Sequence, residues 1–224
     1  MLEEIVMEKI IHKGAEANLI YGHWFGKEVI FKHRIPKGYR IEQIDRKLRV
    51  NRTLNEAKAL IRVKKYGVNV PQVYEIDTKN STIIMKYIRG KKLKETLDSL
   101  PNKKKAQFLR EVGKNIAILH KNGHIHGDIT TSNIILTETQ DIFIIDFGLH
   151  DYSDYIEDKS TDLHLFKRVL ISSHGNDFII CFDAFLEGYR EGYGPEKIDE
   201  CKQIIKNISI IETRGRYVKK EDRI

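Results

Sequence analysis

Three polar side chains near the middle of the chain have the types and the spacing that suit the handling of magnesium and protons. Asp128 precedes Asn133 by five positions and Asp146 by eighteen, and the apolar run from Ile142 to Ile145 leads into Asp146. A transferring phosphoryl group spreads negative charge over several oxygens, so a protein promotes its transfer with metal ions and positioned polar groups. The pattern therefore predicts phosphoryl transfer. Asp128 would be the catalytic residue that orients or deprotonates the attacking oxygen, and Asn133 and Asp146 would be metal ligands.

The first part of the chain offers groups for the phosphates of a nucleotide. A kinase-type site needs a strand lysine for the phosphates and a helix carboxylate that positions this lysine. Lys32 ends an apolar, strand-like run, and Glu56 lies in a helical pattern. The segment Lys13-Gly14-Ala15-Glu16-Ala17 would be the phosphate loop, with one glycine where most kinases have three. The role of Glu16 stays open, because a carboxylate near phosphates is repulsive unless it faces metal, the helix of Glu56 or solvent.

The composition is that of an ordinary folded protein. Of the 224 residues, 41% are hydrophobic and 32% are charged, which is sufficient for a hydrophobic core. Cys181 and Cys201 lack the spacing of a metal or redox site, which favours a reducing compartment. The N-terminus lacks the pattern of a signal peptide, and no apolar run approaches the roughly 18 residues of a membrane span. We therefore expect a cytoplasmic protein with no membrane contact.

Positive charge is concentrated early in the chain. The net charge is +7, and residues 27–65 hold thirteen lysines or arginines against four acidic residues. Such a stretch is either a solvated helix face or a surface that meets RNA phosphates or an acidic partner. A second basic stretch ends the chain and could equally be a frayed tail. The candidate contacts for RNA or a partner are Arg46, Lys47, Arg49, Arg52, Arg214 and Arg216.

Hydrophobic periodicity predicts an α+β fold with a sheet lobe and a helical lobe. Together with the motifs above, this plan indicates a minimal two-lobed, protein-kinase-like fold. We expect an antiparallel sheet lobe with one main helix at 1–88, a mainly helical lobe at 89–210 and a basic tail at 211–224. A nucleotide cleft would lie near residues 88–91. The expected strands are 5–11, 19–24, 29–33, 73–76 and 82–87, and the expected helices are 45–65, 103–121, 158–173, 178–189 and 195–206.

The chain after Gly148 is too short for ordinary docking of a peptide substrate. Only about ten residues pass before the next helical pattern, and no Ala-Pro-Glu element is present. A standard activation segment does not fit there. The expected ATP site is unaffected, but phosphorylation of other proteins by the usual docking mode is disfavoured.

Several segments together resemble the PRPK-type atypical serine/threonine kinase subunit of the KEOPS complex, in an archaeal-like, stand-alone version. The resemblance covers nearly the whole chain and is carried by residues 14–17, 32–40, 52–57, 126–133 and 214–216. It implies a two-lobed kinase or ATPase that uses ATP with Mg²⁺ or Mn²⁺ and is capable of autophosphorylation. It also implies work in threonylcarbamoyladenosine formation next to the tRNA anticodon. The implied partners are an O-sialoglycoprotease-like ATPase subunit, a small regulatory subunit on the N-terminal lobe, and tRNA through the complex.

The resemblance also assigns residues by position. It implies the catalytic role for Asp128, metal binding by Asn133 and Asp146, and phosphate binding by Lys32 with Glu56 as its partner. Residues 85–88 would line the adenine. The implied ATP-binding set is Ile11, Lys13, Gly14, Ala15, Glu16, Ala17, Lys32, Glu56, Met85, Tyr87 and Ile88.

Four alternatives stay open. A small-molecule kinase of the aminoglycoside-phosphotransferase type shares the loop pattern, although about 75 residues after Gly148 leave little for an acceptor pocket. A RIO-type kinase is nearer in size, but the Lys-His-Arg-x-Pro-Lys segment disfavours it. A pseudokinase scaffold would bind nucleotide and RNA without turnover. Finally, His120, His124 and His126 could belong to a metal site, although no cysteine or carboxylate nearby in the sequence completes it.

Overall fold

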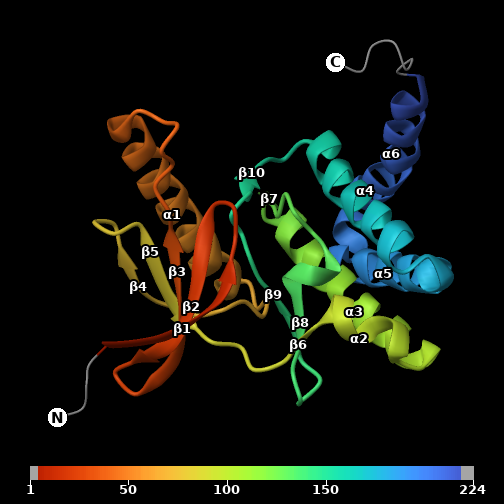
Figure 1. Cartoon of the computed structure of the whole chain (residues 1–224). Helices are drawn as coiled ribbons and strands as arrows, with labels where there is room; N and C mark the ends of the chain where they lie inside the picture. The colour runs from red at the N-terminus through yellow and green to blue at the C-terminus, as the bar shows by residue number, and fades with distance from the viewer. Residues whose placement is uncertain (1–4, 218–224) are drawn as a thin grey trace. The chain divides into compact units, whose positions relative to one another are not determined.

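The computed structural model describes residues 5–217 of the chain, and the side chains of residues 5–214. It divides into two compact units (Figure 1). Unit 1 contains the residues up to Arg89 together with Ile145–Gly148, and unit 2 contains Gly90–Ile144 and the residues from Leu149 onward. The short segment with Asp146 therefore packs with unit 1, although it follows a strand of unit 2 in the sequence.

Unit 1 contains a five-stranded antiparallel sheet and one long helix. The strand order is β1-β2-β3-β5-β4, and α1 (Glu42–Lys65) contacts β4 and β5. The turn between β2 and β3 has positive φ angles at Phe25 and Gly26, as a two-residue type I′ hairpin requires. The prediction of five strands and one helix is confirmed. The strand bounds are β1 (Ile5–Lys13), β2 (Ala17–Trp24), β3 (Lys27–Arg34), β4 (Val73–Asp77) and β5 (Thr82–Lys86).

The alternation of side chains along β3 separates the hydrophobic core from the polar site. Val29 and Phe31 lie on one face, where they form a buried cluster with Ile84 of β5. Because strand side chains alternate between faces, Lys32 and Arg34 point to the opposite face. Both reach the buried Glu56 of α1. The pleat of a single strand thus places two cations beside one helix carboxylate.

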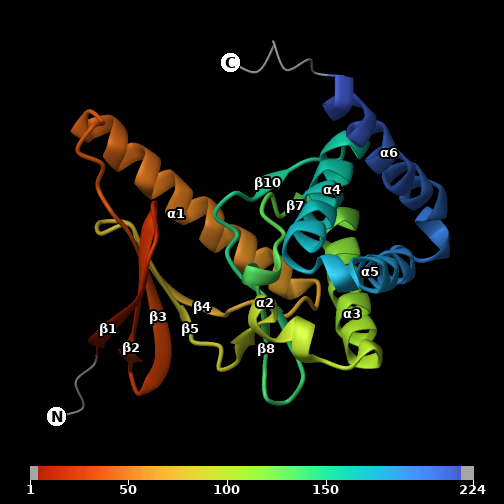
Figure 2. The ribbon, with the colours of Figure 1, turned by 45° about the vertical axis from the view of Figure 1, so that its right-hand side comes forward.

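Unit 2 is mainly helical, and its helices pack closely (Figure 2). The pair α3 and α5 makes the most extensive contact, and glycines permit it: a Cβ on Gly188 would lie 1.8 Å from the backbone oxygen of Arg110. The helix α6 packs against α4. The long helices are α3 (Asn102–Lys121), α4 (Ile156–Ser173), α5 (Phe178–Tyr193) and α6 (Ile198–Tyr217), with a short α2 (Leu93–Thr96).

Short strands and turns complete unit 2 and hold the loops that carry the candidate catalytic residues. One three-stranded sheet has the order β6-β8-β9, and β7 pairs with β10. None of β6, β7, β8 or β10 was predicted, because strands this short have no measurable periodicity. Their bounds are β6 (Lys91–Lys92), β7 (His124–Ile125), β8 (Ile134–Leu136), β9 (Ile142–Ile144) and β10 (Asp151–Tyr152). The 3₁₀ turns are η1 (Leu97–Ser99), η2 (Thr131–Asn133), η3 (Gly175–Asp177) and η4 (Pro195–Lys197).

The predicted end of the last helix was wrong. Pro195 begins a 3₁₀ turn, and α6 then continues to Tyr217, well past Lys206. Packing against α4 explains the extension, since Ile208 is buried and Glu212 forms a 2.7 Å ion pair with Lys167 of α4. Residues 211–217 of the expected tail are thus helical. Residues 218–224 and the side chain of Arg216 lie outside the described part of the chain.

Among the described residues, no single helix is both long and apolar enough to cross a membrane, while the sharply bent pair of α4 with η3 and α5 passes by length and composition alone.

Candidate active site

A buried carboxylate between two cations forms the polar centre of unit 1. Lys32 Nζ lies 2.5 Å from Glu56 Oε1 and 2.8 Å from Asp146 Oδ1, and Arg34 Nη2 lies 2.6 Å from Glu56 Oε2. The side chain of Glu56 is 1% exposed. Burial alone would lower the pKa of Lys32, but Glu56 and Asp146 outweigh it and raise this pKa above its usual value. Lys32 is therefore held as a cation. The expected Lys32–Glu56 pair is present, and Arg34 is a participant that the sequence analysis did not single out.

Asp146 sits in a strained turn that directs its carboxylate. Its φ angle is +64°, in the left-handed region that only a small share of non-glycine residues adopt. The backbone N–H of Gly148 donates to Asp146 Oδ1 at 3.1 Å, and Phe147 between them is buried. The Asp146 side chain remains about half exposed. A carboxylate anchored at one oxygen but accessible to solvent suits a metal ligand.

Glu16 lies against α1, the helix that carries Glu56, which is one of the three directions considered for its carboxylate. Arg52 Nη1 donates to Glu16 Oε2 at 2.7 Å, and Lys37 Nζ donates to the backbone oxygen of Ala15. The loop itself closes through a 3.0 Å bond from the Gly14 N–H to the Ala17 oxygen. A Cβ on Gly14 would lie only 2.9 Å from that oxygen. The single glycine therefore sits where the tight turn requires it, and Glu16 fastens the loop to the helix that carries Glu56.

The residues expected around the adenine lie at the end of β5 and just after it. Met85 pairs with Ile30 of β3, the backbone N–H of Tyr87 donates to the Glu28 oxygen, and Ile88 is buried. Ile11, by contrast, is 45% exposed on the edge strand β1. Lys13 at the end of β1 is also exposed.

In unit 2 the candidate catalytic loop, residues 126–133, brings Asp128 and Asn133 into direct contact. Asn133 Nδ2 donates to the Asp128 backbone oxygen at 3.0 Å and to Asp128 Oδ2 at 2.9 Å. The turn η2 reverses the direction of the backbone between Asp128 and Asn133 and so brings the two side chains together. Because the amide nitrogen of Asn133 faces Asp128, its amide oxygen is directed elsewhere and can serve a cation.

Asp162 of α4 anchors the start of the catalytic loop. Its carboxylate accepts the backbone N–H groups of His126 at 2.9 Å and Gly127 at 3.0 Å, and it lies 3.2 Å from His120 Nε2. Burial opposes ionisation, but the hydrogen bond from His120 and the loop contacts hold the pKa of Asp162 below its usual value. Gly127 adopts a φ of +80°, and a Cβ there would lie 2.4 Å from the Leu149 oxygen. Nothing in the sequence near Asp162 indicated this role.

Asp146 in unit 1 and Asn133 in unit 2 each carry a side-chain oxygen of the kind that suits a hard divalent cation. Among residues 5–214, no group of three or more His, Cys, Asp or Glu side chains is arranged to hold a metal ion. Magnesium commonly takes one or two protein oxygens together with phosphate oxygens and water. The Asp146 carboxylate and the Asn133 amide oxygen are oxygen ligands of this kind. Each residue, taken by itself, therefore fits a magnesium ion that is bound chiefly through the oxygens of a nucleotide.

The histidines near the loop serve as hydrogen-bonding and packing groups. His120 Nδ1 lies 2.8 Å from the Tyr189 hydroxyl, and His124 Nδ1 lies 2.8 Å from His150 Nε2. Burial, with the nearby His124 and His126, lowers the pKa of His150 to about 4, which keeps the ring neutral. The alternative of a metal site at His120, His124 and His126 was wrong for the described part of the chain, since no such cluster forms there.

Comparison with known proteins indicates the family of this chain. A family model described as the RIO domain matches residues 31–155. A KEOPS complex subunit Bud32 from Pyrococcus abyssi is 46% identical over 215 residues, which cover 93% of this chain and 96% of that protein. The chain belongs to the Bud32 family. Its domain is a RIO-type atypical kinase domain with an α+β fold, as the KEOPS kinase resemblance implied.

Other relatives of this Bud32-family chain are longer. A probable bifunctional tRNA threonylcarbamoyladenosine biosynthesis protein from Methanobrevibacter smithii is 44% identical over 94% of this chain but only 37% of its own length. A protein of the same name from Methanocaldococcus jannaschii is 38% identical over 95% of this chain and 38% of its own length. The chain thus matches just over a third of these bifunctional proteins. The argument against a RIO-type domain was wrong, because the Lys-His-Arg segment lies inside the matched range.

A kinase-type domain of this family uses ATP with a divalent metal ion in general. The candidate residues fall within or close to the range that the RIO domain model covers. Lys32, Glu56, Asp128, Asn133 and Asp146 all lie inside residues 31–155, whereas the phosphate loop precedes them.

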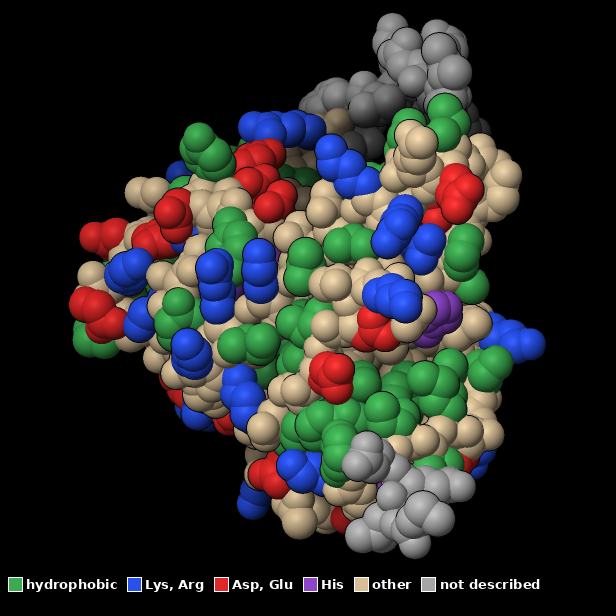
Figure 3. All heavy atoms as spheres, turned by 90° about the vertical axis from the view of Figure 1, so that its left-hand side faces the viewer, with side chains coloured by type: hydrophobic (Ala, Val, Ile, Leu, Met, Phe, Trp, Pro, Cys, Tyr) green, Lys and Arg blue, Asp and Glu red, His purple; other side chains and the backbone are tan. Residues whose placement is uncertain are grey.

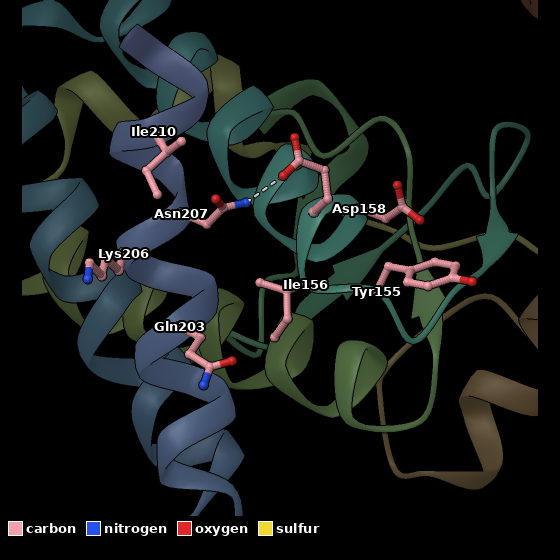
Figure 4. Close-up of a pocket in the computed structure, with 8 residues that line it drawn as sticks. Tyr155, Ile156, Asp158, Gln203, Lys206, Asn207 and Ile210 are labelled. Atoms are coloured by element: carbon pink, nitrogen blue, oxygen red, sulfur yellow. Dashed lines mark hydrogen bonds between the residues drawn. The ribbon is translucent and has the colours of Figure 1, made fainter. Parts of the chain in front are cut away.

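Outside these residues, the Bud32-family chain has an open groove in unit 2, between the start of α4 and the middle of α6 (Figure 4). Its volume is about 680 Å³. Figure 4 shows Asn207 of α6 beside the beginning of α4, where its Nδ2 donates to Glu157 Oε2 at 2.9 Å. The groove contains none of the predicted site residues. Its lining residues are Tyr155, Ile156, Glu157, Asp158, Gln203, Lys206, Asn207 and Ile210.

The predicted RNA or partner contacts differ in how they are used within the fold. Arg49 Nε lies 2.7 Å from Asp45 Oδ2, and Arg52 is paired with Glu16. Arg46 and Lys47, which lie on the same helix, are exposed. At the other end of the chain, Arg214 Nη1 lies 2.7 Å from Glu157 Oε1. Two of the four predicted contacts on α1, Arg49 and Arg52, therefore form ion pairs within the fold, while Arg46 and Lys47 are exposed to solvent.

Proposed function

We propose that the protein is the ATP-dependent kinase and ATPase subunit of a KEOPS complex and supports threonylcarbamoyladenosine formation on tRNA. The relatives named as a KEOPS subunit and as tRNA threonylcarbamoyladenosine biosynthesis proteins support the biological setting. The observation that carries the chemical part is the direct bonding of Asn133 to Asp128, together with the buried Lys32–Glu56 pair. A strand lysine paired with a helix glutamate, and a loop that carries a catalytic Asp and a metal-binding Asn, are the parts that kinase-type phosphoryl transfer uses.

Each residue has a defined task in this proposal. Asp128 accepts the proton of the attacking oxygen, which is water in ATP hydrolysis and a serine or threonine hydroxyl in autophosphorylation. Asn133 holds the Asp128 carboxylate through its Nδ2, and Lys32 binds phosphate oxygens. Mg²⁺ or Mn²⁺ would supply positive charge for the phosphate oxygens, and Asn133 and Asp146 would be its protein ligands.

The phosphate loop and the end of β5 provide the remaining contacts with the nucleotide. The backbone of Gly14–Ala17 approaches the phosphates, and its fastening by Glu16 and Lys37 keeps the loop in place without the usual three glycines. Met85, Tyr87 and Ile88 line the adenine, with Ile11 and Lys13 at the margin of the site. Glu56 acts by orienting Lys32.

The edge strand β1 is the surface we propose for a small regulatory subunit. Ile5, Met7, Ile10 and Ile11 are between 45% and 55% exposed, an unusual number of apolar side chains for one edge strand. Figure 3, viewed from the side where β1 lies in Figure 1, shows hydrophobic side chains gathered in one patch. Such a strand can pair with a partner protein through its backbone and bury these side chains. The other partners are an O-sialoglycoprotease-like ATPase subunit and, through the complex, tRNA.

The test is ATP hydrolysis by the purified chain, alone and with tRNA, the O-sialoglycoprotease-like subunit and the small subunit. We expect strong stimulation of magnesium-dependent turnover by the partners. A Met7→Asp variant, which places a charge in the apolar patch, should lose the response to the small subunit and keep the response to the ATPase subunit. An exposed control, Lys27→Asp in the β2–β3 hairpin region, should respond to both.

The outcomes separate the proposed function from its alternatives. If no partner stimulates turnover and the chain transfers phosphate to small alcohols, the protein is a small-molecule kinase instead. Nucleotide binding without any turnover, in all combinations, would favour a pseudokinase scaffold. Incorporation of labelled phosphate into the chain itself would show autophosphorylation.

The exposed basic residues of α1 are proposed to contact tRNA phosphates or an acidic partner. Reversing both charges with Arg46→Glu and Lys47→Glu should weaken tRNA association and reduce the slope of log affinity against log salt by about 1 to 2, because each lost phosphate contact removes one released counterion. The matched control reverses Lys64 and Lys65 at the far end of α1, which are also exposed. An unchanged salt slope in the Arg46 and Lys47 variant would exclude tRNA as the ligand of this surface.

A further inference from the structure

Three polar side chains from distant parts of unit 2 form a continuous chain of hydrogen bonds behind the catalytic loop. Asp98 of η1 places Oδ1 2.5 Å from His174 Nδ1, and His174 Nε2 lies 3.1 Å from the Thr131 hydroxyl oxygen of η2. His174 directly follows α4, 76 positions after Asp98 and 43 after Thr131. The fold brings the three together, and the reaction scheme above uses none of them.

The chemistry of these groups determines the direction of the hydrogen bonds. A carboxylate only accepts, so Asp98 requires a proton on His174 Nδ1. In the neutral ring Nε2 is then an acceptor, and the Thr131 hydroxyl donates to it. The arrangement has the order of an acid, histidine and hydroxyl triad. Thr131, however, is fully buried, so its oxygen has no access to a substrate and cannot be a nucleophile.

His174 is held rigidly from its own backbone. Its N–H donates to the Leu170 oxygen at 2.9 Å, and its oxygen accepts the N–H of Asp177 at 2.9 Å. Asp177 is fixed in turn by a 2.6 Å ion pair with Lys105 of α3. The imidazole is itself only 3% exposed. A side chain anchored between α4 and α3 in this way can restrain whatever it bonds to.

Thr131 begins the turn that orients the catalytic pair. The N–H of Asn133 donates to the Thr130 oxygen at 3.0 Å, and the Asn133 side chain holds Asp128 at both its backbone and carboxylate oxygens. Asp162 anchors only the beginning of the loop, at His126 and Gly127. The bond from Thr131 to His174 is therefore a second anchor, placed at the turn itself.

We propose that His174, oriented by Asp98, is a positioning residue that fixes the catalytic loop through Thr131 and so keeps Asn133 bonded to Asp128. This inference rests on the proposed function, because it assigns a cause to the geometry of Asp128. Without the bond, the turn gains freedom, Asn133 leaves Asp128 for part of the time, and fewer encounters are productive.

The central test compares Thr131→Val with Thr131→Ser. Valine keeps the shape but removes the donor, whereas serine keeps the hydroxyl. We expect kcat for magnesium-dependent ATP turnover to fall about tenfold in Thr131→Val, with little change in KM, and to stay near the original value in Thr131→Ser. His174→Asn should resemble Thr131→Val. Ile204→Val, a buried change in α6, provides a control that lowers stability to a similar degree without touching the loop.

The second measurement is independent of activity. Backbone hydrogen exchange at Asn133 reports opening of the turn, and it should be faster in Thr131→Val and His174→Asn than in Thr131→Ser and Ile204→Val. Faster exchange with reduced kcat in the first two variants alone supports the positioning role. Unchanged exchange, or an equal loss of kcat in Ile204→Val, overturns it.

Including Asp128→Asn in the same assay distinguishes a failure of the positioning role from a failure of the proposed function. If Asp128→Asn loses turnover while Thr131→Val keeps both turnover and slow exchange, the positioning role fails and the proposed function stands. If Asp128→Asn retains turnover, the proposed function fails, and the exchange data alone decide whether His174 restrains the loop.

Discussion

Replacing Asp128 by Asn should lower magnesium-dependent ATP turnover by about a thousandfold while leaving ATP binding nearly unchanged. A positioned general base typically contributes a factor of about 10² to 10⁴, and an amide cannot accept the proton. The amide oxygen of asparagine can still accept the bond from Asn133 Nδ2, so the shape of the loop should survive. The measurements are single-turnover rates and the dissociation constant of a fluorescent ATP analogue.

The matched control is Asp141→Asn, an exposed aspartate in the turn before β9 that bonds to its neighbours Thr137 and Thr139. It should turn over ATP at the original rate. Equal turnover in the Asp128 and Asp141 variants would contradict the catalytic role and favour a protein that binds nucleotide as a scaffold.

Replacing Glu56 by Gln should destabilise the protein by about 3 to 5 kcal/mol and also reduce ATP turnover. The carboxylate offsets the charges of both Lys32 and Arg34 in a buried site, and removing one member of a buried ion-pair network leaves uncompensated charge. The amide nitrogen of glutamine would also face one of the two cations. Urea denaturation followed by circular dichroism gives the free energy of unfolding.

Glu42→Gln is the comparison for this variant, because Glu42 lies on the same helix and is exposed. Its effect should stay within about 0.5 kcal/mol, as for most surface substitutions. If Glu56→Gln were equally mild, the buried network would contribute little to folding, and a loss of turnover would then report on the orientation of Lys32 alone.

Local patterns predicted most of the fold. Short apolar runs bounded by turn residues identified all five strands of unit 1, and helical spacing identified α1, α3, α4 and α5 to within a few residues. Helices and strands that bury one face carry their period in the sequence, so such elements are readable from it. The end of α6 was misplaced because contacts with α4, including the Glu212–Lys167 pair, extend the helix beyond the point where its own pattern weakens.

In the candidate site, too, local features could be predicted from the sequence and long-range contacts could not. The five-residue spacing was enough to select Asp128 and Asn133 as candidates, but the hydrogen bonds between them were seen only in the structure. The sequence could also have indicated that Arg34 lies beside Lys32 in the site. Residues two apart on a strand share a face, and Arg34 is two positions from Lys32. The anchoring of the loop by Asp162, 35 positions after Gly127, had no local signal.

The sequence by itself determined the class of chemistry, because phosphoryl transfer needs a few side chain types at short, fixed separations. Only the tertiary structure decided what holds those side chains in place. Glu16 meets Arg52 across 36 positions, Arg34 meets Glu56 across 22, and Asp98 meets His174 across 76. Partners this far apart are brought together by the packing of whole helices and strands. Their pairing therefore leaves no periodic trace in the chain.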